Sequence, residues 1–131
     1  MFEPYVISDD GFENVIKNGR VTGYQLKTRI AYYRGVPLSM VDELELVVDD
    51  EPVPQEKIHF SVGGETFTLK EMETVTSTKW EFGQQATLFV DQPGGLSKGE
   101  HKVFLRQTTR VAYYPFPLEG RRTRIMTIGG Q

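Results

Sequence analysis

Two similar phrases in the sequence carry the residues best suited to molecular recognition. Residues 29–33 read Arg-Ile-Ala-Tyr-Tyr and residues 110–114 read Arg-Val-Ala-Tyr-Tyr, and together they hold four of the six tyrosines of the chain. Aromatic rings supply contact area and arginine anchors it, so the phrases have the composition of a recognition surface. We expect this surface, here called the rim, to comprise Tyr32, Tyr33, Arg34, Tyr113, Tyr114 and Phe116.

The residue types leave three uses of the rim open. It could stack on a sugar or a flat aromatic group, it could be buried against another protein, or it could be a packed end of the core. A stand-alone carbohydrate-binding or adhesion protein would use it in the first way, and a protein-interaction domain in the second.

Groups able to perform acid–base or metal chemistry are scattered along the chain. The two histidines, His59 and His101, are far apart and lack a metal-binding spacing, so each is predicted to be a solvated surface residue. The acidic run at 49–51 precedes Pro52 and lacks the calcium-loop pattern, which predicts a turn. The sequence contains no nucleophile elbow, phosphate loop or dinucleotide fingerprint. We therefore expect neither a catalytic residue nor a metal or other cofactor in this chain.

Long strands of alternating character must position the two phrases. Residues 22–32 and 102–114 each alternate between an inward and an outward set, as half-buried strands do. The second inward set contains one oddity, Gln107. Prolines follow both runs, and because proline cannot donate to a strand ladder, both strands should end alike and bring the phrases to one rim.

Shorter elements account for the rest of the fold. Turns are expected at Asn18-Gly19 and Gly63-Gly64, and a hairpin joining 80–82 to 86–90. Residues 70–73 could make one helical turn, but the β-branched and polar run at 74–78 argues against a long helix and predicts a loop. Further strands are predicted over residues 5–8, 12–16, 44–48, 58–62, 66–69 and 123–128, with a turn at 119–122. The pattern predicts an all-β fold, a two-sheet antiparallel sandwich of about eight to nine strands, with a closed barrel as the alternative.

Length and composition favour one soluble domain. The 131 residues predict a single domain over 1–131, and the absence of cysteine excludes disulfides and thiolate zinc sites. No apolar run approaches the roughly 18 residues that cross a bilayer, and the opening Met-Phe-Glu-Pro has an acid where an export signal would have lysines. We expect a cytoplasmic protein with no membrane contact.

The net charge of −3 hides an uneven distribution. Residues 41–73 carry a net charge of −8, whereas residues 102–124 carry +5. This asymmetry argues against nucleic-acid binding through one dominant basic face. The asymmetry is compatible with docking onto a partner surface of complementary charge. It is equally compatible with two faces of the protein that are solvated differently.

Five stretches together resemble the small β subunit of bacterial C-glycoside deglycosidases. They read Asp-Asp-Gly-Phe-Glu-Asn-Val at 9–15, Ala-Tyr-Tyr-Arg-Gly-Val-Pro-Leu-Ser-Met at 31–40, Trp-Glu-Phe-Gly at 80–83, Pro-Gly-Gly-Leu at 93–96 and Gly-Glu-His at 99–101. The resemblance spans nearly the whole chain, and its most specific stretch is Tyr-Tyr-Arg-Gly-Val-Pro-Leu-Ser at 32–39.

The resemblance implies a β-sandwich subunit that works with a larger α subunit of isomerase-like barrel fold. That α subunit would carry a divalent metal of the Mn²⁺ or Mg²⁺ class together with the acid–base residues. The implied substrate is a 3-keto C-glycoside, in which an oxidised glucose is joined through carbon to a flavonoid. The rim would then contact the α subunit, and this chain would have no catalytic activity by itself.

Overall fold

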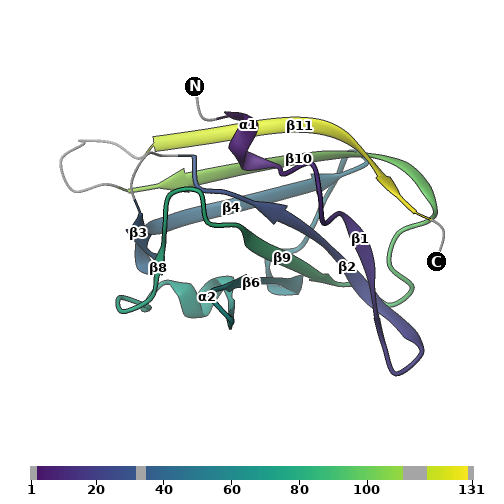
Figure 1. Cartoon of the computed structure of the whole chain (residues 1–131), viewed down its shortest axis with the longest axis horizontal. Helices are drawn as coiled ribbons and strands as arrows, with labels where there is room; N and C mark the ends of the chain where they lie inside the picture. The colour runs from purple at the N-terminus through teal and green to yellow at the C-terminus, as the bar shows by residue number, and fades with distance from the viewer. Residues whose placement is uncertain (1–2, 32–34, 111–117, 130–131) are drawn as a thin grey trace.

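The computed structural model describes residues 3–31, 35–110 and 118–129, and almost all of its regular structure is β-strand (Figure 1). Its strands are β1 Glu13–Lys17, β2 Arg20–Thr28, β3 Val36–Pro37, β4 Val41–Val48, β5 Glu51–Pro52, β6 Ile58–Val62, β7 Glu65–Thr68, β8 Lys79–Trp80, β9 Ala86–Asp91, β10 Gly99–Thr109 and β11 Leu118–Ile128. Its helical turns are α1 Glu3–Val6, α2 Leu69–Met72 and the 3₁₀ turns η1 Leu38–Met40 and η2 Gln55–Lys57.

The strands form two large antiparallel sheets and one small one. The first sheet has the strand order β1-β2-β9-β6-β7 and the second the order β11-β10-β4-β5, while β3 and β8 pair by themselves. The two large sheets lie one above the other as open layers (Figure 1). The predicted all-β, two-sheet antiparallel sandwich is therefore confirmed, and the barrel alternative is wrong. The two large sheets hold nine strands, and the small sheet adds two.

Alternating residues of both sheets fill one core. The inward residues of β2, Tyr24, Leu26 and Thr28, are at most 1% exposed, as the period-2 pattern predicts. Val103 and Leu105 of β10 are fully buried from the opposite sheet. At the centre the rings of Phe60 and Trp80 meet edge to face, with centroids 5.1 Å apart.

Three hairpin turns follow the local chemistry of their residues. Asn18-Gly19, Asp49-Asp50 and Gly63-Gly64 each have positive φ at both central positions, the geometry of the tight turns that match strand twist. These turns join β1 to β2, β4 to β5 and β6 to β7. The predicted helical turn at 70–73 is also present as α2, capped by Thr68 and Glu71 in a reciprocal capping box.

The prediction of a strand over residues 5–8 is wrong, because the chain forms the helical turn α1 there. Pro4 lies in the first turn, where a missing N–H leaves no bond unmade. The adjacent Val6 and Ile7 are both fully buried, which a strand with alternating sides could not achieve against one sheet.

The predicted hairpin between 80–82 and 86–90 is also wrong. Trp80 pairs with Val36 of β3, while β9 pairs with β2 and β6. The Trp80 indole N–H donates to the Gln84 carbonyl at 2.9 Å, so the chain curls around the buried ring instead of forming a ladder. The turn predicted at 119–122 lies within β11, which begins at Leu118 and forms the predicted edge strand.

Candidate functional site

All six predicted rim residues, Tyr32, Tyr33, Arg34, Tyr113, Tyr114 and Phe116, lie outside the described residues. The residues that flank them are described, and they fix the positions between which each undescribed segment must run. β10 ends, and β11 and β3 begin, at the same end of the sandwich (Figure 1). The flanks of both phrases therefore converge, which is the arrangement that a shared rim requires.

Gln107 of β10, the strand that leads into the second phrase, is hydrogen-bonded to the first phrase and to Thr28 before it. Its side chain is 1% exposed, and its amide oxygen accepts the backbone N–H of Ala31 at 2.9 Å. Its amide nitrogen donates to the Thr28 hydroxyl at 2.9 Å and to the Arg29 carbonyl at 2.7 Å. Both amide N–H groups and the carbonyl oxygen are thus used, which explains the polar residue in an otherwise apolar inward set.

A close backbone approach reinforces this junction. Gly120 pairs with Gln107 in the ladder between β10 and β11. A Cβ atom at Gly120 would lie 2.4 Å from the Ala31 Cβ and 3.3 Å from a methyl group of Val6. Glycine is therefore required where α1 and the first phrase cross the sheet.

Arg110, the first residue of the second phrase, is held by the segment that follows the first. Its backbone N–H donates to the Met40 carbonyl at 2.8 Å, and its guanidinium pairs with Asp42 at 2.9 Å. The two phrases are thus joined on both sides of the rim, through Ala31 on one side and Met40 on the other.

An exposed aromatic pair lies beside the first phrase and was missed in the sequence. Tyr5 of α1 and Phe82 are 39% and 50% exposed, and their rings meet edge to face with centroids 6.1 Å apart. The Tyr5 carbonyl accepts the Arg29 N–H at 2.8 Å, and the Arg29 side chain donates to the Gly83 carbonyl at 3.1 Å. The two rings thus form a small exposed aromatic surface next to Arg29, the first residue of the first phrase.

His101 is buried, so the prediction of a solvated surface histidine is wrong for this residue. It is 7% exposed, with Nδ1 2.6 Å from a carboxylate oxygen of Asp49 and Nε2 2.7 Å from the Ser97 carbonyl. The other oxygen of Asp49 accepts the Lys102 N–H at 2.9 Å. These bonds join the turn between β4 and β5 to the start of β10, which makes His101 a structural residue. His59 is half-buried in β6 and packs against Phe89, with ring centroids 5.9 Å apart.

The acidic and basic halves of the sequence meet on the outer face of the β4–β10–β11 sheet. Arg106 of β10 donates to Glu45 at 2.9 Å and to Glu119 at 3.2 Å, and also binds Glu43. Hydrogen bonds to Glu119 and then Glu45 raise the pKa of Arg106. Part of the charge asymmetry is thus matched within one sheet, and the two readings of it, partner docking and two differently solvated faces, stay predictions.

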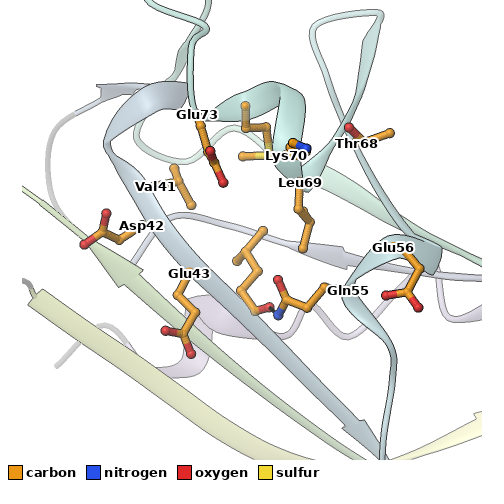
Figure 2. A pocket seen from close by; sticks show the side chains of 11 residues that line it. Val41, Asp42, Glu43, Gln55, Glu56, Thr68, Leu69, Lys70 and Glu73 are labelled. Atoms are coloured by element: carbon orange, nitrogen blue, oxygen red, sulfur yellow. Dashed lines mark hydrogen bonds between the residues drawn. The ribbon is translucent and has the colours of Figure 1, made fainter.

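A cleft of about 530 Å³ opens between β4, η2 and α2 (Figure 2). The cleft has an apolar floor and a largely acidic border. The floor is formed by Val41, Leu44, Leu69 and Met72. The border is formed by Asp42, Glu43, Glu56, Glu73 and Lys70. Sequence patterns gave no signal for this cleft, since its walls come from segments that only the fold brings together.

Within residues 3–31, 35–110 and 118–129, no three side chains among His, Cys, Asp and Glu are grouped to hold a metal ion. In those ranges no helix is long and apolar enough to span a membrane.

The sheet topology defines the structural class of this protein, which is an all-β, two-sheet antiparallel sandwich. The profile of the family described as C-glycoside deglycosidase beta subunit matches residues 2–113, and the chain belongs to this family. A C-glycoside deglycosidase beta subunit of Eubacterium cellulosolvens is 39% identical over 100 residues, which cover 76% of this chain and 68% of the relative. A 3′-dehydrocarminate deglycosidase beta subunit of a Microbacterium species is 30% identical over 95 residues, covering 72% and 70%. The family predicted by resemblance is therefore confirmed.

Proposed function

We propose that this chain acts as the small β subunit of a hetero-oligomeric C-glycoside deglycosidase, together with a larger α subunit. The observation that carries the proposal is the family match over residues 2–113. A subunit designated β implies an α subunit, and we assign to that partner the isomerase-like barrel fold. Assembly and reaction in the cytoplasm accord with a chain that has no cysteine.

The proposed reaction breaks the carbon–carbon bond between a 3-keto-glucosyl unit and a flavonoid-type aglycone. The 3-ketone acidifies the C2–H bond, and a base removes that proton. The electron pair forms the C1–C2 double bond while the pair of the C1–aryl bond stays on the aryl carbon, which takes up a proton. The products are the free aglycone and an unsaturated keto sugar, with no net oxidation. The 3′-dehydro substrate named for one relative has the oxidation state that this elimination needs.

The proposal gives no reacting group to this chain. The α subunit would supply the base, the acid and a divalent metal of the Mn²⁺ or Mg²⁺ class, which would polarise the ketone. The described side chains do not fit such a metal. The contribution of the β subunit is then to hold the α subunit in its active form.

The rim is the proposed contact with the α subunit, through Tyr32, Tyr33, Arg34, Tyr113, Tyr114 and Phe116. Three features of the described residues support it. The flanks of both phrases are bonded to each other through Gln107, Arg110 is bonded to Met40, and the exposed rings of Tyr5 and Phe82 lie alongside. Aromatic and arginine side chains are the ones that most often dominate the binding energy of protein interfaces.

Co-expression with the candidate α subunit tests the function. The two chains together should release free aglycone from a 3-keto C-glucoside, whereas this chain alone should release none and the α subunit alone should release much less. The proposal fails if the two chains do not co-elute, or if leaving out this chain does not alter the release of aglycone.

A double variant tests the rim within the same assay. Tyr33→Ala with Arg34→Ala should abolish co-elution or activity. The matched control is Ile16→Ala with Lys17→Ala, which removes one large apolar side chain and one cation from the β1–β2 hairpin at the opposite end of the molecule (Figure 1). Full retention of binding and activity by the rim variant would overturn the rim assignment and leave the enzyme assignment standing.

A further inference from the structure

The strand that borders the cleft, β4, has an edge whose first half pairs with no other strand of the described residues. On one side β4 pairs with β10 from Val41 to Val48. On the other side only Val47 and Val48 pair with β5, and the next bond joins the Val53 N–H to the Leu46 carbonyl at 2.9 Å. Residues 41–45 therefore present a free strand edge to the cleft.

A side chain takes the place of a strand at this edge. Gln55 of η2 donates its amide N–H to the Leu44 carbonyl at 2.7 Å. Because the N–H and C=O of one strand residue point to the same side, the Leu44 N–H also faces the cleft. Such an edge can accept the backbone of an added strand.

The walls of the cleft select the side chains of such a strand. The floor is apolar, since Val41, Leu44 and Met72 are at most 8% exposed. Glu56 and Glu73 stand on either side of Leu69 (Figure 2). A strand that alternates apolar and basic residues would place one set on the floor and the other near these carboxylates.

The acids of the border are not equally available. Asp42 forms an ion pair with Arg110, and Glu43 shares Arg106 with Glu45 and Glu119, so both are already engaged by arginines. Within the described part of the chain Glu56 and Glu73 have no ion-pair partner. Two unpaired carboxylates against one lysine, Lys70, leave the open part of the cleft acidic.

We propose that this cleft binds an extended basic segment of the α subunit, which adds as a strand along the free edge of β4. The inference rests on the proposed function, because it takes the α subunit as the occupant. Continuity with the rim supports that choice: Asp42 in the cleft wall binds Arg110, the first residue of the second phrase, and Val41 pairs with Thr109. One partner could therefore cover the rim and the cleft together.

Charge reversal in the intact β subunit tests the proposal. Glu56→Lys with Glu73→Lys should weaken binding to the α subunit at least tenfold at low salt, with a smaller loss at high salt because screening reduces the repulsion. The matched control is Glu13→Lys with Glu100→Lys, which makes the same change in net charge at two exposed positions outside the cleft. The control should bind within twofold of the wild type. Equal binding by the cleft variant and the control would overturn the proposal.

Amide hydrogen exchange in the wild-type complex supplies a second measurement that needs no variant. Residues 41–45 should become protected when the α subunit binds, because those of their N–H groups that face the cleft, including that of Leu44, would enter a ladder. Unchanged exchange in that segment would overturn the proposal even if the charge-reversed variant misfolds. The proposal would also be overturned if the wild-type chain forms a homodimer that the charge reversal dissociates, while binding to the α subunit is unchanged. Failure of the wild-type chain to bind the α subunit is a different result, which contradicts the proposed function itself.

Discussion

The Gln107 side chain accepts a hydrogen bond from the backbone N–H of Ala31 at 2.9 Å, and this contact joins the first phrase to β10, the strand that leads into the second. The same side chain also satisfies the Arg29 carbonyl and the Thr28 hydroxyl. The residues that leave the fold toward the rim are thus positioned by the core of the sandwich. A substitution inside the core should therefore also alter binding through the rim.

Replacing Gln107 by leucine should destabilise the protein and weaken α-subunit binding. The change keeps the volume but leaves the part-buried Ala31 N–H without its partner, at about 1–3 kcal/mol for an unpaired group. The Arg29 carbonyl keeps only the Thr28 hydroxyl, at 3.5 Å. Urea unfolding followed by tryptophan fluorescence measures the loss. Thr108→Val is the matched control, because the Thr108 hydroxyl is buried without a partner among the described residues, and its removal should be neutral or stabilising. Equal stability of Gln107→Leu and Thr108→Val would contradict the anchoring role.

The pair of His101 and Asp49 should make stability depend on pH. Both partners of the imidazole, the Asp49 carboxylate and the Ser97 carbonyl, accept hydrogen bonds, so this arrangement favours the protonated ring, in which both nitrogens donate. Burial lowers the pKa of His101, but the hydrogen bonds to Asp49 and Ser97 outweigh it and the net shift is upward. The hydrogen bonds from His101 and from the Lys102 N–H lower the pKa of Asp49.

The signs of these shifts fix the pH window. A raised histidine pKa stabilises the fold fully below about pH 6.5, and that stabilisation is lost as the pH rises through the folded-state pKa. A lowered carboxyl pKa stabilises the fold above about pH 4, and that stabilisation is lost as the pH falls. The difference in unfolding free energy between wild type and His101→Gln should peak between these limits and shrink by about pH 9. A difference that stays constant from pH 5 to 9 would contradict the charged pair.

Gly120→Ala should be strongly destabilising for a glycine that sits in a strand. The added Cβ would lie 2.4 Å from the Ala31 Cβ, so the first phrase would have to move, at a cost of about 1–3 kcal/mol. Gly129→Ala is the control, since a Cβ there meets no atom within 4 Å. Adding Ala31→Gly to Gly120→Ala should restore part of the lost stability, and a thermal-unfolding double-mutant cycle measures this coupling. If the changes in unfolding free energy of the two substitutions are additive, the added Cβ does not clash with the Ala31 side chain.

The sequence predicted those parts of the fold that depend on neighbouring residues. Period-2 alternation placed the inward sets of β2 and β10, and pairs such as Asn18-Gly19 located turns because both residues tolerate positive φ. Residues 5–8 were too few to distinguish a strand from a helical turn. The partners of His101 and Gln107 lie 52 and 76 residues away in Asp49 and Ala31, so no local pattern could reveal that these polar side chains are buried. The cleft beside β4 could not be predicted either, because its lining comes from segments that are far apart in the sequence.

Phe82 should contribute to α-subunit binding without contributing much to folding. Its ring is 50% exposed and touches Tyr5 by its edge, so Phe82→Ser removes little buried area from the isolated chain. If the partner covers the surface beside Arg29, the same change removes an aromatic contact from an interface, where truncation often costs about 1–4 kcal/mol in binding. Binding to the α subunit should therefore weaken at least fivefold, while the urea midpoint changes little.

Ile125→Ser provides the control for Phe82→Ser. Ile125 is 59% exposed on β11, in the part of that strand remote from the phrases, where it pairs with Lys102. Both variants replace a large exposed apolar side chain by serine, so general effects on solubility should be alike. Only Phe82→Ser should raise the dissociation constant for the α subunit, as measured by titration calorimetry. If both variants bind as tightly as the wild type, the aromatic pair lies outside the interface and the contact is confined to other residues.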